Sequence, residues 1–205
     1  MPSKFTILTA YDAAFKNVAE ISCANFRAYC ELHGIDFVES IIPDDYEMHP
    51  SWFKVGAIQS LITKNDFVMW IDADALILGK AHPQTLINPS STLNISADEN
   101  GINCGVMVWK NCGQSLEVLD KIYRLYPEYK DHQWWEQGAL QDIIRQSVDV
   151  TRATNLVPKH VFNCYTNEIG PDTHIIHYPG FSILEKEILM KAQSIALKRN
   201  GHGYK

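Results

Sequence analysis

The sequence predicts an α/β fold in which helices flank a mainly parallel, Rossmann-like sheet. From residue 5 onward, short apolar runs of strand length alternate with longer stretches of helical periodicity. The first helical stretch ends at a glycine and a second strand follows, which is the order of a βαβ unit. The 205 residues, 46% of them hydrophobic, suffice for one sizeable core, and no Ser/Gly-rich linker divides them. We therefore expect a single domain over residues 1–205.

The first elements are defined by periodicity and by one glycine. Residues 5–9 predict a strand, and apolar residues recurring every three or four positions over residues 15–32 predict an amphipathic helix capped by Gly34. Residues 35–42 predict the second strand, parallel to the first. No G-x-G-x-x-G lies between the first strand and the helix, so the common dinucleotide fingerprint is absent. A bound nucleotide must therefore be held in another way.

The rest of the chain continues the alternation. An acidic loop at residues 43–50 is interpreted as surface rather than site. The predicted helices cover residues 51–62, 83–87, 115–126, 131–146 and 183–198, and the predicted strands cover residues 67–74, 92–97, 106–109, 157–165 and 174–178. The last helix carries Leu184, Ile188 and Ile195 on one face and lysines on the other.

Two acids, Asp72 and Asp74, follow the apolar residues 67–71. Side chains two apart on a strand project from the same face, so both carboxylates are expected to converge beyond the sheet edge, where open α/β folds bind ligands. Neither Gly, Pro nor Asn stands beside them, so the local sequence does not indicate a turn. Two converging carboxylates repel each other unless a cation lies between them, so a divalent metal is the first hypothesis. The alternative is a solvated strand end, because Asp-x-Asp pairs are common by chance.

Charge, cysteines and the N-terminus exclude several classes of protein. The formal net charge of −6 and the scattered basic residues argue against nucleic acid as a partner. Five cysteines without a C-x-x-C spacing indicate neither a zinc site nor a disulfide framework. The N-terminus leads directly into a strand, and no run of about 18 apolar residues follows, so we expect no signal peptide and no integral membrane segment. This pattern predicts a cytoplasmic protein.

Several single residues have a functional interpretation, a structural one, or both. His174 and His177 stand three apart on a predicted strand and face opposite sides, so one of them can complete a two-carboxylate metal site. Lys54, on its own, is typical of a solvated helix lysine. Gly105 either permits close approach of the backbone to a ligand or marks a bulge. The adjacent residues 134–136, two tryptophans and a glutamate at a helix start, either line a sugar site or anchor the core.

Five short segments resemble one enzyme family, in the family's order. They are WFK (52–54), WIDADAL (70–76), NCGVM (103–107), WEQGAL (135–140) and HYPG (177–180). With these segments the chain resembles retaining glycosyltransferases of the GT-A fold. The resemblance is closest to the galactosyltransferase, mannosyltransferase and xyloglucan xylosyltransferase family of fungi and plants, and it covers residues 52–180.

The resemblance implies a metal site and a donor site. Asp72, Asp74 and His177 would bind Mn²⁺, with Mg²⁺ as the second choice, and the ion would bridge the donor's diphosphate. Hard oxygen ligands with one imidazole suit Mn²⁺. Lys54 and the backbone N–H of Gly180 would contact the donor phosphates.

The resemblance also implies where the base, the ribose and the sugar lie. Base and ribose would lie at the end of the first strand, against Thr9, Ala10 and Tyr11. The donor-sugar pocket would comprise Asp98, Asn103, Gly105, Glu136 and Gln137, with Gln137, Glu136 and Asp98 as the catalytic candidates. An amide facing the anomeric carbon can stabilise an oxocarbenium-like centre but is a poor nucleophile. Retention would then come from front-face attack by the acceptor hydroxyl, with a diphosphate oxygen taking its proton.

We therefore expect a metal-dependent glycosyltransferase that moves a sugar from a nucleotide-diphosphate sugar to a hydroxyl of a glycan or another acceptor, with retention. UDP-hexose or UDP-pentose is the favoured donor, and GDP-mannose is a further candidate. No motif encodes the acceptor, the linkage or the oligomeric state. Three departures from the family are expected: no membrane anchor precedes the domain, Glu136 stands where relatives often have Asp, and Lys186 is only a candidate for the second phosphate-binding lysine.

Two alternatives remain open at this point. A haloacid-dehalogenase-type phosphatase also places Asp-x-Asp after a strand, but here Leu76 stands in place of the usual Thr or Val and no G-D-x-x-x-D follows. A non-catalytic sugar-nucleotide or glycan-binding protein is the other alternative, although such a module has little use for a complete metal set.

Overall fold

Apolar strands form a central six-stranded sheet. The computed structural model describes residues 3–199. In the order β2-β1-β3-β6-β5-β7, the strands are Asp36–Ile41, Phe5–Tyr11, Phe67–Ile71, Gly101–Lys110, Leu93–Asp98 and Thr154–Leu156. Three of the five neighbouring pairs are parallel, and β6 runs antiparallel to both β3 and β5. The prediction of an α/β fold with a mainly parallel sheet is confirmed.

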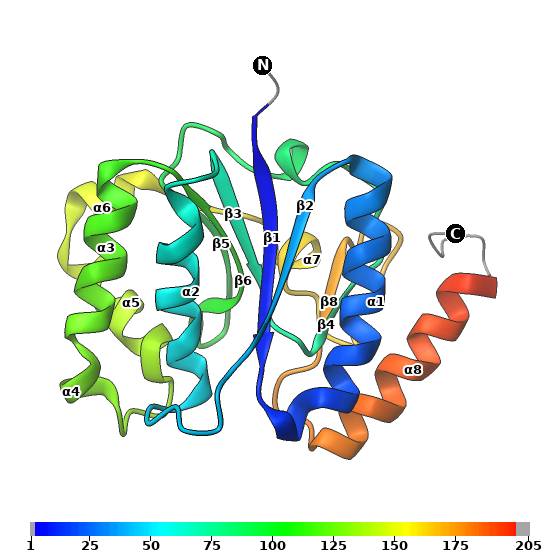
Figure 1. The fold of residues 1–205 in the computed structure, drawn as a ribbon. Helices are drawn as coiled ribbons and strands as arrows, with labels where there is room; N and C mark the ends of the chain where they lie inside the picture. Colours follow the sequence, from blue (N-terminus) through cyan, green and yellow to red (C-terminus); the bar gives the residue numbers. More distant parts are fainter. Residues whose placement is uncertain (1–2, 200–205) are drawn as a thin grey trace.

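Helices cover both sides of this sheet (Figure 1). On one side are α2, α3, α5 and α6, which are Phe53–Ile62, Gly113–Arg124, Trp135–Gln146 and Val148–Ala153. On the other side are α1 (Lys16–His33) and α8 (Ile183–Arg199). The short elements are η1 Ala13–Phe15, η2 Pro50–Trp52, η3 Pro83–Leu86, α4 Tyr126–Tyr129 and α7 Lys159–Phe162. Each layer packs its own apolar cluster against the sheet, so the strand ends are held from both sides.

The βαβ opening is present as expected. Asp12 accepts a hydrogen bond from the backbone N–H of Phe15 and so caps the turn before α1. Gly34 ends α1 with a φ of 63°, a left-handed conformation that glycine adopts without strain. The strand that follows, β2, lies parallel to β1.

A second sheet of two strands lies beside α1. It pairs β4 (Ala75–Ile77) with β8 (Ile175–His177) in antiparallel register, and Ala75 lies opposite His177. This pairing brings the late histidine next to the residues that follow β3.

The expected strand at residues 157–165 is wrong. Pro158 precedes the short helix α7, and Cys164 makes only an isolated bridge to Ile176. Within α7 only Phe162 is buried, and Val157 lies in the extended segment before it. A short apolar run does not by itself distinguish a strand from a buried turn of helix.

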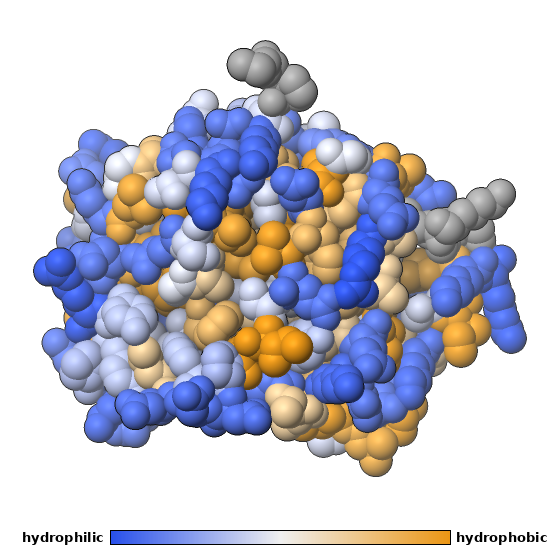
Figure 2. All heavy atoms as spheres, in the orientation of Figure 1, coloured by the Kyte–Doolittle hydropathy of each residue, from blue (hydrophilic) through white to orange (hydrophobic). Residues whose placement is uncertain are grey.

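The last helix, α8, exposes the apolar face that an ordinary amphipathic helix would bury. Its apolar residues Leu184, Ile188 and Ile195 are 65%, 58% and 52% exposed, whereas Lys186 and Met190 are buried. In Figure 2, orange apolar atoms reach the surface at the lower right, where α8 lies. Lys186 forms a buried ion pair with Asp74, and this pair rather than an apolar stripe decides which face of α8 turns inward.

His174 gives the fold a dependence on pH. It is buried against Tyr29, and burial, followed by the nearby His33, lowers the pKa of His174 to about 4. The unfolded chain takes up this proton near pH 6.5 and the folded protein only near pH 4, so stability should fall between these values as the pH drops. The full shift is worth about 3 kcal/mol.

Urea unfolding at pH 7.5 and pH 4.5 measures this difference. The variant His174→Gln is the control, because carboxylates titrate in both proteins and only the imidazole differs. We expect the loss of unfolding free energy to be smaller in the variant. An equal loss in both proteins would contradict the assignment to His174.

Candidate active site

The two acids lie in a turn, not on a continuous strand. β3 ends at Ile71, and the backbone N–H of Ala75 donates to the carbonyl of Asp72 at 3.1 Å, which closes a turn over residues 72–75. The chain must turn here because β3 pairs in the central sheet and β4 pairs with β8. The expected strand over residues 67–74 is corrected accordingly. The expected convergence still occurs: ligand atoms of Asp72, Asp74 and His177 all lie within 4.8 Å of one another.

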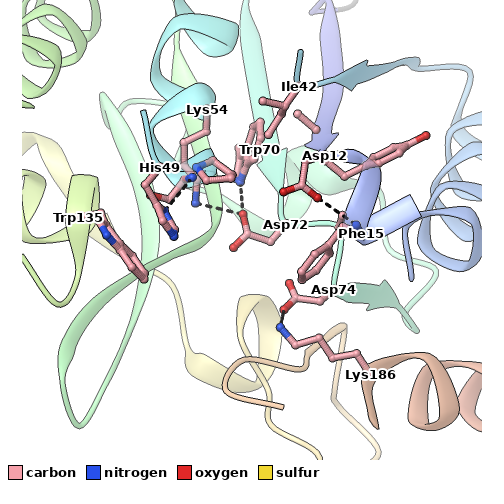
Figure 3. Close-up of a pocket in the computed structure, with 15 residues that line it drawn as sticks. Asp12, Phe15, Ile42, His49, Lys54, Trp70, Asp72, Asp74, Trp135 and Lys186 are labelled. Carbon is pink, nitrogen blue, oxygen red and sulfur yellow. Dashed lines mark hydrogen bonds and ion pairs between the residues drawn. The ribbon is translucent and has the colours of Figure 1, made fainter. Parts of the chain in front are cut away.

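Asp72 has one oxygen held and one oxygen facing the cluster. Its Oδ1 accepts hydrogen bonds from Trp70 Nε1 at 2.6 Å and from Lys54 Nζ at 3.1 Å. Its Oδ2 lies 3.8 Å from His177 Nε2. Figure 3 shows Trp70 and Lys54 reaching the same carboxylate. These donors fix the carboxylate so that the second oxygen stays available.

Asp74 likewise has one oxygen held by a lysine and one oxygen facing the cluster. Its Oδ2 accepts from Lys186 Nζ at 2.6 Å, and its Oδ1 lies 3.2 Å from His177 Nε2. Burial alone would raise the pKa of Asp74, but His177 and Lys186 outweigh burial and lower the pKa well below its usual range. Asp74 is therefore ionised at neutral pH. The inward face of α8 is explained by this pairing.

His177 is oriented by Asn163, a residue that no sequence motif indicated. The Nδ1 of His177 lies 2.7 Å from the side-chain oxygen of Asn163, which is fully buried. An amide oxygen only accepts, so Nδ1 carries the proton and Nε2 faces the two carboxylates. Outer partners of this kind orient metal-binding histidines in many proteins.

Gly105 makes room for this imidazole. A Cβ atom on Gly105 would lie 2.4 Å from Cε1 and 2.8 Å from Nδ1 of His177. The backbone N–H of Gly105 donates to the side-chain oxygen of Asn103 at 2.9 Å. The pairing of β5 with β6 shifts from Ile95–Met107 to Ser96–Asn103, so Gly105 lies in an irregularity of β6, as the bulge interpretation expected. At this point the glycine also lies close to His177.

Lys54 and Glu136 form a buried ion pair behind Asp72. Lys54 Nζ lies 3.0 Å from Glu136 Oε1 and donates to the carbonyl of Cys104 at 3.2 Å. Burial alone would lower the pKa of Lys54, but Asp72 and Glu136 outweigh burial and raise it. Burial raises the pKa of Glu136, and the charge of Lys54 opposes that change. Lys54 is thus an enclosed charge rather than a solvated helix lysine.

A cavity of about 380 Å³ opens on one side of the cluster, and its charged lining comprises two lysines and three aspartates (Figure 3). Both lysines that hold the aspartates, Lys54 and Lys186, line it. Ala10 and Tyr11 line its wall at the end of β1, where the base and ribose were expected. Thr9 is fully buried, and its hydroxyl has no hydrogen-bond partner among residues 3–199.

Two aromatic residues line this cavity: His49, which the sequence did not assign to the site, and Trp135, for which a sugar site and the core were both open. His49, from the loop interpreted as surface, stacks on Trp135 with ring centroids 3.7 Å apart and planes 8° apart. Trp135 has a φ of 40°, in the left-handed region that bulky residues rarely adopt. Backbone strain of this kind tends to cluster at functional sites.

A second cavity of about 380 Å³ opens on the other side of His177, and its charged lining is acidic. Its lining includes Asp98, Asn103, Gln137, Tyr165 and Gly180. Asp98 Oδ2 accepts from Tyr165 at 2.5 Å and from Asn103 at 3.1 Å. Burial opposes ionisation of Asp98, but these bonds outweigh it and lower the pKa of the carboxyl. Gln137 accepts from the backbone N–H of Cys104 at 3.0 Å, which anchors its amide.

The structure therefore brings most of the predicted site residues together around the Asp–Asp–His cluster. Glu136 is the exception among the catalytic candidates, because it is 5% exposed and contacts the cluster only through Lys54. Gly180 lies at the second cavity with a φ of 76°, on the side away from the two lysines.

Comparison with known proteins identifies the family. The model of the galactosyl transferase GMA12/MNN10 family matches residues 6–91 and 79–173. The chain belongs to this family. The resemblance inferred from the five segments is thereby confirmed.

Curated relatives of this GMA12/MNN10 family member are longer proteins. Xyloglucan 6-xylosyltransferase 4 of Arabidopsis thaliana is 26% identical over 122 residues, which is 50% of this chain and 22% of that protein. Galactomannan galactosyltransferase 1 of Cyamopsis tetragonoloba is 23% identical over 120 residues, which is 52% of this chain and 28% of that protein. The chain thus spans about a quarter of the length of these relatives.

Solved structures share the fold of this family member. A glycosyltransferase involved in glycosylation of the major capsid of PBCV-1 superposes with a TM-score of 0.75 at 17% identity, covering 92% of this chain and 98% of that one. The galactosyltransferase LgtC, solved with donor and acceptor sugar analogs, gives a TM-score of 0.57 at 13% identity, covering 91% and 95%. These similarities establish the GT-A fold. None of the helices within residues 3–199 is long and apolar enough to cross a bilayer.

Proposed function

We propose that this GMA12/MNN10 family member transfers a sugar from a nucleotide-diphosphate donor to a hydroxyl of a glycan acceptor, with a divalent metal ion at Asp72, Asp74 and His177. The observation that carries this proposal is the position of the cluster. It lies between a cavity where two lysines face the two aspartates of the cluster and Asp12, and a cavity lined by two carboxylates and several amides. A diphosphate suits the first cavity and a neutral sugar suits the second.

The three residues fit Mn²⁺ or Mg²⁺. Two carboxylate oxygens and one imidazole nitrogen face a common point, and each residue is held in place by its other polar atom. Carboxylates with one imidazole suit Mn²⁺. When bound, such an ion offsets the negative charge that develops on the leaving diphosphate.

The lysines in the first cavity support a diphosphate there. Lys54 and Lys186 already neutralise the two aspartates in part, and their ammonium groups line the cavity wall. Ammonium groups stabilise phosphate oxygens as point charges. In this arrangement the base and ribose lie toward Ala10 and Tyr11.

The second cavity supports transfer with retention by front-face attack. Asp98 is ionised, but its Oδ2 already accepts two hydrogen bonds, so Asp98 is better suited to hold sugar hydroxyls than to act as a nucleophile. Glu136 lies behind Lys54 and does not touch this cavity. Since neither Asp98 nor Glu136 suits a nucleophile, the acceptor hydroxyl would attack from the face that the diphosphate leaves, and a diphosphate oxygen would take the proton. Gln137 stabilises the positive charge that develops on the sugar.

A glycan acceptor is favoured by the relatives, which are named for transfer to xyloglucan and galactomannan. The phosphatase alternative has no support, because both the family match and the fold are those of glycosyltransferases.

Thermal stabilisation with a panel of nucleotides tests the proposal. We expect UDP or GDP to raise the melting temperature by a few degrees with Mn²⁺ and not with chelator, since ligand at 100 times Kd adds about 2.7 kcal/mol. The matching nucleotide sugars should then release nucleoside diphosphate in the presence of glycan acceptors. Stabilisation that is equal in chelator, without turnover, would point to a sugar-nucleotide binding protein. No stabilisation by any nucleotide would overturn the donor site.

A further inference from the structure

A buried chain of three charges leads from Asp72 into the protein interior. Lys54 Nζ lies 3.1 Å from Asp72 Oδ1 and 3.0 Å from Glu136 Oε1, so the two carboxylates share the ammonium group almost equally. The third donor direction of the ammonium group points to the carbonyl of Cys104 at 3.2 Å. Lys54 and Glu136 are each only 5% exposed, so water on the side of the core does not screen the interactions among these three charges.

The second carboxylate is not needed to orient Asp72. Trp70 Nε1 already holds Asp72 Oδ1 at 2.6 Å. Glu136 also stands apart from both cavities, since its Oε1 contacts Lys54 and its Oε2 is buried with no hydrogen-bond partner among the described residues. Lys54 is the charged partner that Glu136 contacts, and the side chain of Ser51 is a further, neutral neighbour, so the charge of Glu136 reaches Asp72 through Lys54.

The formal charges show what Glu136 changes. Asp72 and Lys54 alone form a neutral pair, which attracts a cation weakly. With Glu136 included the three charges sum to −1, the same as an unpaired Asp72. Burial makes this difference effective, because electrostatic interactions are stronger where water is excluded.

We propose that Glu136 is a positioning residue that acts through Lys54, offsetting the lysine charge so that Asp72 keeps its negative charge for the metal ion. This inference rests on the metal site of the proposed function. It moves Glu136 from the catalytic group, where sequence reasoning placed it, to a supporting role outside the sugar pocket. It also explains how a lysine can sit against a metal ligand without abolishing its charge.

Calorimetric titration of Mn²⁺ alone, without nucleotide, measures the effect directly. We expect Glu136→Gln, which keeps the shape of the side chain, to weaken Mn²⁺ binding by about 10- to 100-fold. The double variant Lys54→Met/Glu136→Gln removes both charges and leaves Asp72 with its own charge. We expect its Mn²⁺ affinity to return to within a few-fold of the wild type. Glu117→Gln, at an exposed position on α3, is the matched control and should bind as the wild type does.

Each outcome decides the inference. Recovery of Mn²⁺ affinity in the double variant is the supporting result, because Mn²⁺ affinity then follows the net charge beside Asp72, whereas stability alone would recover whenever an unpaired buried lysine is removed. Equal weakening in the single and double variants would overturn the route through Lys54. Unchanged Mn²⁺ affinity in Glu136→Gln, with a lower kcat, would overturn the positioning role and make Glu136 a substrate contact. A wild type that binds no Mn²⁺ would overturn the proposed metal site and, with it, this inference. If the wild type binds Mn²⁺, the metal site stands and the variants test the role of Glu136 by itself.

Discussion

Asp74→Asn is expected to abolish Mn²⁺ binding and sugar transfer. The substitution removes the charge from an oxygen that faces His177 Nε2 at 3.2 Å. The loss of Mn²⁺ affinity should exceed the roughly 10- to 100-fold typical of an outer partner. Calorimetric titration of Mn²⁺ and assay of nucleoside diphosphate release measure both effects.

The same substitution should also destabilise the fold, because Lys186 loses its buried partner. Removing one member of a buried ion pair costs about 3–5 kcal/mol, and Lys186 is 8% exposed. The double variant Asp74→Asn/Lys186→Met separates the two effects. Urea unfolding should show recovered stability in the double variant, with Mn²⁺ binding still lost. A single variant that still binds Mn²⁺ as the wild type does would exclude Asp74 as a ligand.

Gly105→Ala is expected to damage the same centre from the opposite side. The added Cβ would meet the ring of His177 at 2.4 Å, and that ring is 4% exposed and tied to Asn163. The imidazole cannot move aside without losing this bond, so Nε2 turns away from the carboxylates. We expect Mn²⁺ affinity to fall by about 100-fold and the overpacked site to lose about 1–3 kcal/mol of stability.

Gly56→Ala is the control for this substitution. Gly56 lies within α2, and an added Cβ there meets no atom within 4 Å. Alanine favours the helix by up to about 1 kcal/mol, so the control should be equal to or more stable than the wild type. Its Mn²⁺ affinity should be unchanged. Wild-type Mn²⁺ binding by Gly105→Ala would show that His177 is not a ligand.

The sequence was sufficient for most of the fold because local patterns encode it. Helix α1 and its Gly34 cap follow from periodicity and backbone freedom, and buried β3 follows from its apolar run. Asp72 and Asp74 were expected to converge, and they do, although a turn brings them together rather than the alternation of a strand. The short apolar run alone did not show where the strand stops.

The long-range contacts of the site could not be read from the sequence. Asn163 contacts His177 from a segment whose apolar residues suit a strand as well as a helical turn. Lys186 faces inward because it meets Asp74, which is 112 positions away. Hydrophobic periodicity reports which face of a helix is apolar. It does not report that an ion pair overrides that pattern, as it does in α8.

The pairing of β4 with β8 has a consequence for how the protein folds. Asp74 and His177 are 103 positions apart, so their meeting closes a loop of about half the chain. The entropy of such closure must be offset by contacts formed elsewhere, and non-local pairings of this kind form slowly. We therefore expect the cluster to assemble after the central sheet. A cation bound between the two ends of this loop would hold them together only after the cluster has formed. It would therefore slow unfolding and leave the folding rate nearly unchanged.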